Sequence, residues 1–259
     1  MLAASDAIVL KHFRRAQIHH KADGSEVTVA DRGAERVLRR HLAQHFPQDA
    51  VLGEEYGGTL TRSGRCWLMD PIDGTASYVL GLPHFGTLLS LIEDGEPVFG
   101  VIHLPALSET TYAANGHGCW LSRPNKKPTR VSVAQATPLA RAQVGLTSFK
   151  ASDMARKRGP WRLSRLPAQI DRLRPIGDCV QYAVVCRGLL DAAIDPLMHP
   201  WDIGALVPCV REAGGSVSDL AGHTTHLIER SSFVAASTET LRRAIVNQVK
   251  PRAQSTKNQ

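Results

Sequence analysis

The stretch Trp67-Leu-Met-Asp-Pro-Ile-Asp-Gly-Thr75 is the most informative part of this sequence. Its apolar start predicts a buried strand, and two carboxylates, Asp70 and Asp73, follow that strand three residues apart. Pro71 fixes the backbone between them, so both carboxylates can point into one space. The last two residues of the stretch are expected at the start of a helix, where backbone amides bind phosphate oxygens.

Two carboxylates beside a phosphate site repel the phosphate and each other. At ~4 Å and an effective dielectric constant of about 20, each like-charge pair costs about 4 kcal/mol. The arrangement therefore calls for divalent cations between the charges, and oxygen ligands select hard ions such as Mg²⁺. Two further acidic segments meet that demand: Gly53-Glu-Glu55 after a short strand, and His199-Pro-Trp-Asp202 at the start of an apolar helix.

Each acidic segment also has an ordinary structural interpretation. Taken alone, Asp202 is a helix N-cap, Glu54 with Glu55 is a solvated turn, and residues 70–73 form an Asx-type turn. Because all three segments occur in one chain, a metal site is the stronger hypothesis.

The flanking segments predict helices and an antiparallel sheet first, and alternating helices and strands later. In the first half we expect helices over 10–18 and 31–46, a break at 21–25, strands at 51–52 and 66–69, and hairpins at Asp94-Gly95 and Asn115-Gly116. In the second half we expect strands over 143–147, 191–194, 216–218 and 233–235, and helices over 179–190, 202–213 and 238–249, the last capped by Thr238.

These elements divide the chain into two halves and a tail. Residues 1–135 form an N-terminal α+β half with most of the acidic ligands, and residues 136–250 form a C-terminal α/β half. The polar tail, residues 251–259, is expected to be disordered.

Length and composition are those of a globular protein. The chain has 259 residues, of which 43% are hydrophobic and 21% are charged, so a disordered chain is excluded. No apolar run approaches the ~20 residues that span a bilayer, so no membrane partner is expected. The first residues lack the layout of a signal peptide. The five cysteines form no C-x-x-C pair, which favours reduced, mostly buried thiols and a cytoplasmic location.

The net charge of +7 favours anionic ligands and is unevenly distributed. Between Arg123 and Arg174 there are 13 Lys and Arg against two acids, and residues 154–160 are the densest part. With only Phe149 and Trp161 as aromatic residues, this window lacks a stacking platform, so we favour a solvated surface connection over a nucleic-acid partner. The alternative, an RNA- or ribosome-associated factor, predicts salt-dependent binding that survives chelation.

Several motifs, in order, resemble those of the inositol monophosphatase family. They are Lys21-Ala-Asp-Gly-Ser-Glu-Val-Thr-Val-Ala-Asp31, Gly53-Glu-Glu55, Asp70-Pro-Ile-Asp-Gly-Thr75, and Trp201-Asp202 followed by Glu212-Ala-Gly-Gly215. The resemblance implies a mixed α/β (α+β) fold, a layered α-β-α-β-α sandwich of the sugar-phosphatase type. It also implies a Mg²⁺-dependent phosphomonoesterase that forms a homodimer. The sequence departs from the family pattern at Ser77-Tyr78, where the family often has Asn and Phe.

The resemblance assigns a set of metal ligands. Glu54 and Asp70, with the carbonyl of Ile72, correspond to ligands of a first Mg²⁺. Asp70, Asp73 and Asp202 correspond to ligands of a second, and Glu54 can hold a third. Two such ions stabilise both the entering and the leaving oxygen of an in-line displacement.

Catalytic and phosphate-binding roles follow from the same resemblance. Thr75, with Glu54 or with Asp31, orients or deprotonates the attacking water. The amides of Gly74 and Thr75 hold the phosphate.

Three segments are similar to the histidinol-phosphatase branch of the family: Gly81-Leu-Pro-His-Phe-Gly-Thr-Leu-Leu89, Gly177-Asp-Cys179 and His199-Pro-Trp-Asp-Ile-Gly-Ala-Leu-Val-Pro208. They imply hydrolysis of histidinol phosphate to histidinol and phosphate. Inositol-1-phosphate, or a broad set of small phosphate esters, stays open as an alternative substrate.

Substrate contacts are expected from Asp73, Asp178 and Asp195. An acidic contact suits a cationic alcohol better than a neutral inositol. Structural interpretations remain for two of them, because Asp178 can be a helix N-cap and Asp195, which precedes Pro196, can belong to a turn.

Overall fold

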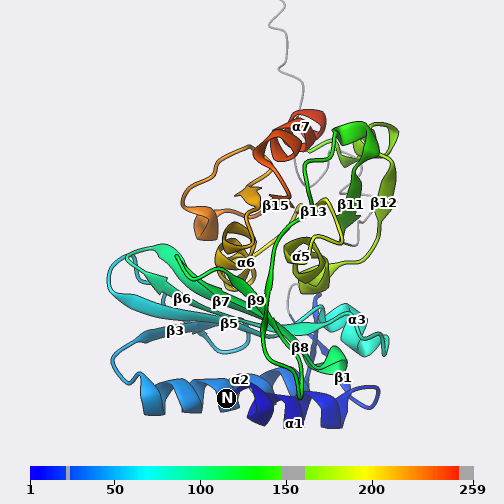
Figure 1. The fold of residues 1–259 in the computed structure, drawn as a ribbon. Helices are drawn as coiled ribbons and strands as arrows, with labels where there is room; N and C mark the ends of the chain where they lie inside the picture. Colours follow the sequence, from blue (N-terminus) through cyan, green and yellow to red (C-terminus); the bar gives the residue numbers. More distant parts are fainter. Residues whose placement is uncertain (22–23, 148–160, 251–259) are drawn as a thin grey trace, which may run out of the picture.

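The computed structural model describes residues 1–21, 24–147 and 161–250, and two main sheets organise them (Figure 1). The larger sheet has the strand order β10-β9-β8-β7-β6-β5-β3-β4. Its strands are β3 (Ala50–Gly53), β4 (Gly57–Gly58), β5 (Arg65–Asp73), β6 (Gly86–Glu93), β7 (Glu96–Leu104), β8 (Glu109–Ala114), β9 (Cys119–Ser122) and β10 (Thr129–Val131). All of its pairs are antiparallel except β3 with β5.

The smaller sheet has the order β12-β11-β13-β15-β14. Its strands are β11 (Gln143–Leu146), β12 (Arg172–Arg174), β13 (Ala192–Asp195), β14 (Ser216–Ser218) and β15 (Phe233–Ala236). Strand β11 pairs in parallel with β12 and β13, and the remaining pairs are antiparallel. A separate antiparallel ladder joins β1 (Ile18–His20) to β2 (Glu26–Thr28).

The helices complete five layers, which Figure 1 shows stacked from bottom to top. Helices α1 (Leu2–His12) and α2 (Val29–His45) cover the outer face of the large sheet. Helices α5 (Asp178–Cys186) and α6 (Pro200–Glu212) lie between the sheets, and α7 (Glu239–Val249) covers the outer face of the small sheet. The short helix α3 (Thr75–Val79) follows β5. The predicted α-β-α-β-α sandwich is confirmed.

Strand β5 is buried on both faces, and its side chains alternate between two cores. Trp67 and Met69 pack with Leu38 and Leu42 of α2. Leu68 belongs to the core on the other face, beneath α6. This period of two explains why the segment before Asp70 is continuously apolar instead of alternating with polar residues.

Most predicted elements are confirmed, but two helices differ from the prediction. The helix expected over 10–18 is wrong, because α1 ends at His12, Arg14 has a φ of 63°, and residues 18–20 pair with β2. The helix expected to reach Leu190 ends at Cys186, because Gly188 adopts a φ of 70°. Both predicted hairpins and the Thr238 cap on the Leu241 amide are present.

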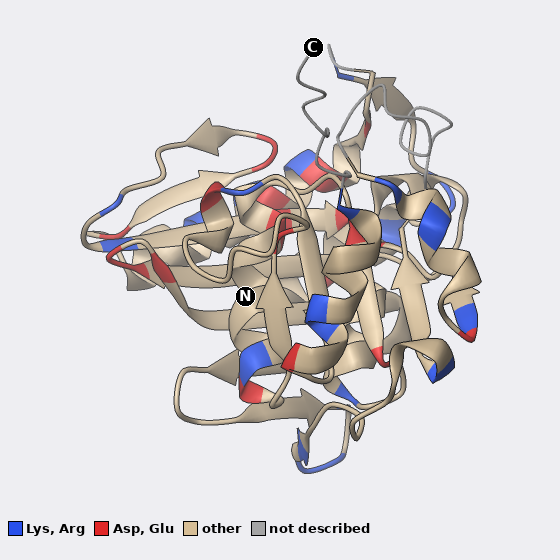
Figure 2. Cartoon of the chain, turned by 90° about the horizontal axis from the view of Figure 1, so that it is seen from above, with Lys and Arg blue, Asp and Glu red and all other residues tan. Residues whose placement is uncertain are grey.

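The large sheet lies within residues 50–131 and the small sheet within 143–236. The division into halves at 135/136 stays a prediction. The tail over 251–259 and the densest basic segment, 154–160, lie outside the described residues. In Figure 2 the described Lys and Arg are spread over the cartoon, with acidic residues among them.

All five cysteines are free and buried, as expected. Among the described residues no helix is both long and apolar enough to cross a membrane.

Candidate functional site

The side chains of Asp70 and Asp73 lie on the same side of the sheet because β5 is irregular between them. Asp70 pairs with Leu88 and Asp73 with Gly86, so β5 uses one residue more than β6 over this interval. In a regular strand, residues three apart point to opposite faces, and the additional residue brings them to the same side. Pro71 has no N–H for the ladder and stands within this bulge.

Asp202 reaches the two β5 aspartates from α6. Oxygens of Asp70, Asp73 and Asp202 lie within 4.8 Å of one another. The helix comes this close to the sheet because Gly204 faces it, since a Cβ there would lie 2.4 Å from the Ser90 hydroxyl. Asp202 is not the helix N-cap. His199 holds that position, and its amide donates to Asp202 at 2.8 Å.

Glu54 follows β3, beside the end of the apolar part of β5. Its amide donates to the Met69 carbonyl at 3.2 Å. Its carboxylate forms an ion pair with Lys21, whose Nζ lies 2.7 Å from Glu54 Oε1 and 2.6 Å from Glu55 Oε1. Burial alone lowers the pKa of Lys21, but its bonds to the two glutamates outweigh burial and raise that pKa above its usual value.

Glu35 of α2 holds the turn that carries Glu54. Its side chain is fully buried and accepts the Glu55 amide at 2.7 Å and the Tyr56 amide at 3.2 Å. These contacts fix the loop after β3.

Thr75 lies between two acceptors. Its hydroxyl is 3.2 Å from Asp31 Oδ1 and 3.0 Å from the Ile72 carbonyl. Asp31 is held by Thr28, whose amide and hydroxyl donate to Oδ2 at 2.8 and 2.6 Å. Gly74 is the N-cap of α3 with a φ of 85°, a conformation that favours glycine.

The carboxylates of this cluster repel one another. Burial raises the pKa of Asp70 well above its ordinary value, and the neighbouring carboxylates raise it further, Glu54 first. Burial also raises the pKa of Asp73 and Asp202, and each is raised again by nearby aspartate charges. No ion pair among the described residues involves these three aspartates. Lys21 pairs with Glu54 and Glu55. Within the part of the chain that the structure describes, the three aspartates therefore have no cationic side chain as a partner.

Asp178 and Asp195 border the same cluster. Burial raises the pKa of Asp178 to about 6, although Ser77 and His84 lower it. Both acids contribute to the raised pKa of Asp73. Asp178 is not a helix cap, because Gly177 is the N-cap of α5 and Asp178 has a φ of 51°. Asp195 is 7% exposed and accepts the Leu197 amide at 3.0 Å, as the predicted turn requires.

Helix α5 closes the cluster on one side. The Cys179 amide donates to Asp73, and Ser77 donates to Asp178 at 3.3 Å. A Cβ on Gly74 would lie 2.8 Å from Asp178 Oδ2, so glycine lets this carboxylate approach. Tyr78, the other departure from the family pattern, is buried and donates to the Val9 carbonyl at 2.7 Å.

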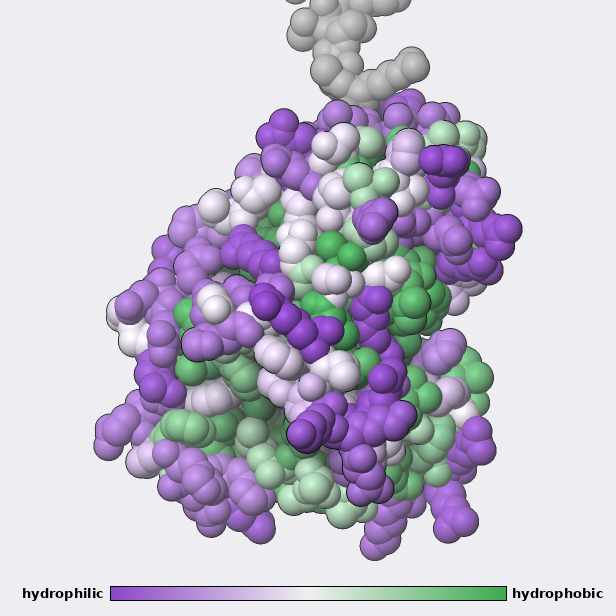
Figure 3. All heavy atoms as spheres, viewed as in Figure 1, coloured by the Kyte–Doolittle hydropathy of each residue, from purple (hydrophilic) through white to green (hydrophobic). Residues whose placement is uncertain are grey.

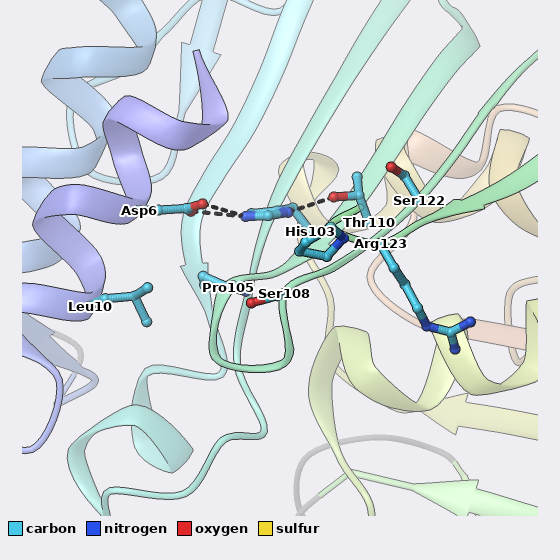
Figure 4. Close-up of a pocket in the computed structure, with 9 residues that line it drawn as sticks. Asp6, Leu10, His103, Pro105, Ser108, Thr110, Ser122 and Arg123 are labelled. Atoms are coloured by element: carbon cyan, nitrogen blue, oxygen red, sulfur yellow. Dashed lines mark hydrogen bonds and ion pairs between the residues drawn. The ribbon is translucent and has the colours of Figure 1, made fainter. Parts of the chain in front are cut away.

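A separate polar group joins α1 to the large sheet (Figure 4). His103 Nε2 lies 2.9 and 3.0 Å from the two Asp6 oxygens, and Nδ1 lies 2.8 Å from the Thr110 hydroxyl. These side chains border a hollow of about 300 Å³ that also contains Leu10 and Arg123. The three residues form an Asp-His-hydroxyl series, but the hydroxyl lies on strand β8 and not at the strand-to-helix turn that exposes a hydrolase nucleophile.

Lys21 and Glu35 are the site residues whose roles the sequence did not indicate. Lys21 opens the N-terminal motif, which marked it as part of a pattern without showing its partners. Glu35 is four residues after Asp31 on the same face of the helix. In the sequence this face also carries the apolar residues Ala34 and Leu38, and that position was the available signal.

Comparison with known proteins agrees with this geometry. The model of the inositol monophosphatase family matches residues 2–253. A histidinol-phosphatase from Mycobacterium tuberculosis is 40% identical over 206 residues, which cover 80% of this chain and 78% of that protein. A fructose-1,6-bisphosphatase/inositol-1-monophosphatase from Thermotoga maritima is 32% identical over 227 residues, covering 86% and 84%.

The fold of this chain is also similar to that of solved structures. An IMPase from Thermotoga maritima superposes with a TM-score of 0.81 at 29% identity, covering 94% of this chain and 91% of that one. The chain therefore belongs to the inositol monophosphatase family and is a phosphoric monoester hydrolase.

Proposed function

We propose that this phosphatase hydrolyses histidinol phosphate and requires divalent cations, two or three Mg²⁺ ions, held by its acidic cluster. The observation that carries the metal requirement is the group of two buried aspartates and one partly buried aspartate whose oxygens lie within 4.8 Å of one another. The substrate is supported by the 40% identity to a histidinol-phosphatase and by the two further acids beside the cluster.

The cluster fits a hard divalent cation. All of its donors are oxygens, the side chains are largely buried, and their pKa values are raised because like charges are close together. Glu54, Asp70, Asp73 and Asp202 would hold the ions, with the Ile72 carbonyl. When bound, such ions supply positive charge that stabilises the developing negative charge of phosphoryl transfer.

The surrounding residues have distinct roles in this proposal. Thr75 and Asp31 share a hydrogen bond and orient the attacking water, and Asp31, whose pKa is raised by burial, takes up its proton. The amides of Gly74 and Thr75 bind the phosphate oxygens. Lys21 keeps Glu54 in place and balances part of the local negative charge.

Asp178 and Asp195 determine the substrate in this proposal. Above pH 6 the Asp178 carboxyl is largely ionised, since its pKa is raised to about 6. A carboxylate at the border of a phosphate site attracts the ammonium or imidazolium of histidinol and offers nothing comparable to a neutral polyol. The chain is proposed to act as a cytoplasmic homodimer on this small phosphate ester.

The test compares substrates of different charge. Phosphate release is measured above pH 7 from histidinol phosphate, inositol-1-phosphate and glycerol-2-phosphate, with Mg²⁺ and with excess chelator. We expect Asp178→Asn and Asp195→Asn to lose roughly 10- to 150-fold on histidinol phosphate, the value of one charged hydrogen bond, and much less on glycerol-2-phosphate. Asparagine at 195 keeps an oxygen that can accept the Leu197 amide.

The exposed Asp171→Asn is the matched control and should leave all three rates unchanged. Equal losses on charged and neutral substrates would show that Asp178 and Asp195 act structurally. Faster hydrolysis of inositol-1-phosphate than of histidinol phosphate would replace the proposed substrate. Full activity in chelator would contradict the metal requirement.

A further inference from the structure

A groove runs along α7, on the outer side of the small sheet. Its volume is about 350 Å³, and it is lined by Gly222, Thr224, Glu239, Arg242, Arg243, Val246, Asn247 and Lys250. The five residues from α7 recur at intervals of three and four, so they share one face of the helix, and Lys250 follows as its C-cap. Figure 1 shows the small sheet between α7 and the layer of α5 and α6, and Asp202 lies on α6, so the groove is separate from the site described above.

Arg242 is a buried charge whose one ion pair among the described residues is a long one, to Glu239. Its side chain is 4% exposed. Its Nε donates to the Ser216 hydroxyl at 2.9 Å, and Nη2 lies 3.9 Å from Glu239 Oε1, beyond hydrogen-bond distance. Neither terminal nitrogen donates a hydrogen bond to any described residue. Burial lowers the pKa of Arg242, and the Arg243 charge lowers it further, while the Glu239 and Asp219 charges raise it.

Two more cations border the groove. Arg243 is 70% exposed and pairs with Glu239 at 2.6 Å. Lys250 extends over Gly222, because a Cβ at that glycine would lie 3.3 Å from the lysine Nζ. The lining thus contains three positive side chains and one carboxylate. In Figure 3 the top of the molecule, where Figure 1 shows α7, is largely hydrophilic.

We propose that this groove binds a small anion carrying a phosphate or carboxylate group, held by Arg242, Arg243 and Lys250. A guanidinium presents two parallel N–H groups that match such an anion, and a buried one forms the stronger hydrogen bonds. The volume is at the lower end of the range for small-molecule sites. In the absence of the anion, Glu239 pairs with Arg243. Its carboxylate therefore competes with the anion for this arginine.

Binding is measured by calorimetry with inorganic pyrophosphate and with citrate, at constant ionic strength. The full chain is freed of metal with a chelator, which is then removed by dialysis because it is itself an anion; the metal-free acidic cluster repels anions. We expect saturable binding of one equivalent. Pyrophosphate binding without citrate binding assigns a phosphoryl ligand, and the reverse assigns a carboxylate ligand.

Variants in the groove give effects of opposite sign. Arg242→Gln and Arg243→Gln should each weaken binding by at least about tenfold, as expected for a lost charged hydrogen bond. Glu239→Gln should tighten binding, because it removes the competing carboxylate. Arg40→Gln, an exposed arginine on α2, is the control and should bind like the wild type.

If Arg242→Gln does not fold, the exposed Arg243 and the partly exposed Lys250 decide the question, since Arg243→Gln and Lys250→Gln alter few packing contacts. Wild-type affinity in both variants, or no saturable binding of either anion, would overturn the proposal. Phosphatase activity of these variants with Mg²⁺ is measured in parallel. It should be unchanged, so failure of the anion site leaves the proposed function untouched.

Discussion

The acidic cluster and Glu109, all buried or partly buried, have opposite electrostatic environments. Asp70, Asp73 and Asp202 face one another, and their pKa values are raised. Glu109 of β8 is also largely buried, but it lies 2.7 Å from Arg123 Nε and 2.5 Å from Arg187 Nη1. Burial alone raises the pKa of Glu109, and the two arginines outweigh burial and bring it below its ordinary value.

The difference separates the proposed metal site from a structural contact. Glu109 already has its counter-charges, and it links the large sheet to the end of α5 through Arg187. The three aspartates have no such partners within the described ranges, so the like charges repel one another, and the proposed cations would remove that repulsion. Uncompensated charge of this kind is concentrated at functional sites, whereas a satisfied pair contributes to stability.

The largest effect is expected from Asp70→Asn. This change removes one charge from the centre of the cluster while keeping its shape. Because bound metal contributes several kcal/mol to phosphoryl transfer, turnover should fall below about a hundredth of wild type. Initial rates of phosphate release at saturating Mg²⁺ measure this.

The same variant should be as stable as the wild type or more stable when both are free of metal, since a repulsive charge is gone. Thermal unfolding in chelator gives this second result. A variant that keeps more than about a tenth of wild-type turnover would show that Asp70 is not a shared metal ligand. Lower metal-free stability would contradict the repulsion itself.

A smaller effect is expected when Mg²⁺ is added to the wild-type protein. Carboxyls with raised pKa values retain protons in the folded state that the unfolded chain releases, so the metal-free protein loses stability as pH rises above 3.8, the ordinary Asp value. Mg²⁺ replaces those protons. At a hundred times its Kd it should stabilise by about 2.7 kcal/mol. At one fixed Mg²⁺ concentration the gain should grow with pH, because fewer protons compete and the Kd falls. Calorimetric melting at pH 5 and pH 8 tests this, and a gain independent of pH would contradict it.

Much of the fold was predictable from the sequence because its signals are local. The apolar run before Asp70 and the Asp-Gly and Asn-Gly hairpins act within a few residues, and each was interpreted correctly. The first helix was placed too late, because residues 18–20 are held as a strand by pairing with β2. The C-terminal end of α5 was missed although Gly188 was visible in the sequence.

The acidic cluster was predictable for a different reason. Three acidic segments occur in one chain, and carboxylates beside the proposed phosphate site are unfavourable without a cation, so the sequence predicted that they meet at a metal site. Their contacts depend on tertiary packing and could not be predicted. Gly204 lets α6 approach the sheet, Lys21 pairs with Glu54, and Asp178 adopts a positive φ instead of capping α5.

The smallest effect is expected at the satisfied pair. Glu109→Gln removes the charge between Arg123 and Arg187 and should destabilise the protein by about 1–3 kcal/mol at pH 7. The pKa of Glu109 is lowered in the folded state, so its contribution is present above 4.5, the ordinary Glu value, and disappears as pH falls through that lowered pKa. Urea unfolding of the two proteins across this pH range measures the difference. Glu93→Gln, an exposed residue 3.9 Å from Arg65, is the control and should change stability by less than about 0.5 kcal/mol. A difference between Glu109→Gln and wild type that persists unchanged at low pH would mean that Glu109 stabilises by packing rather than by charge.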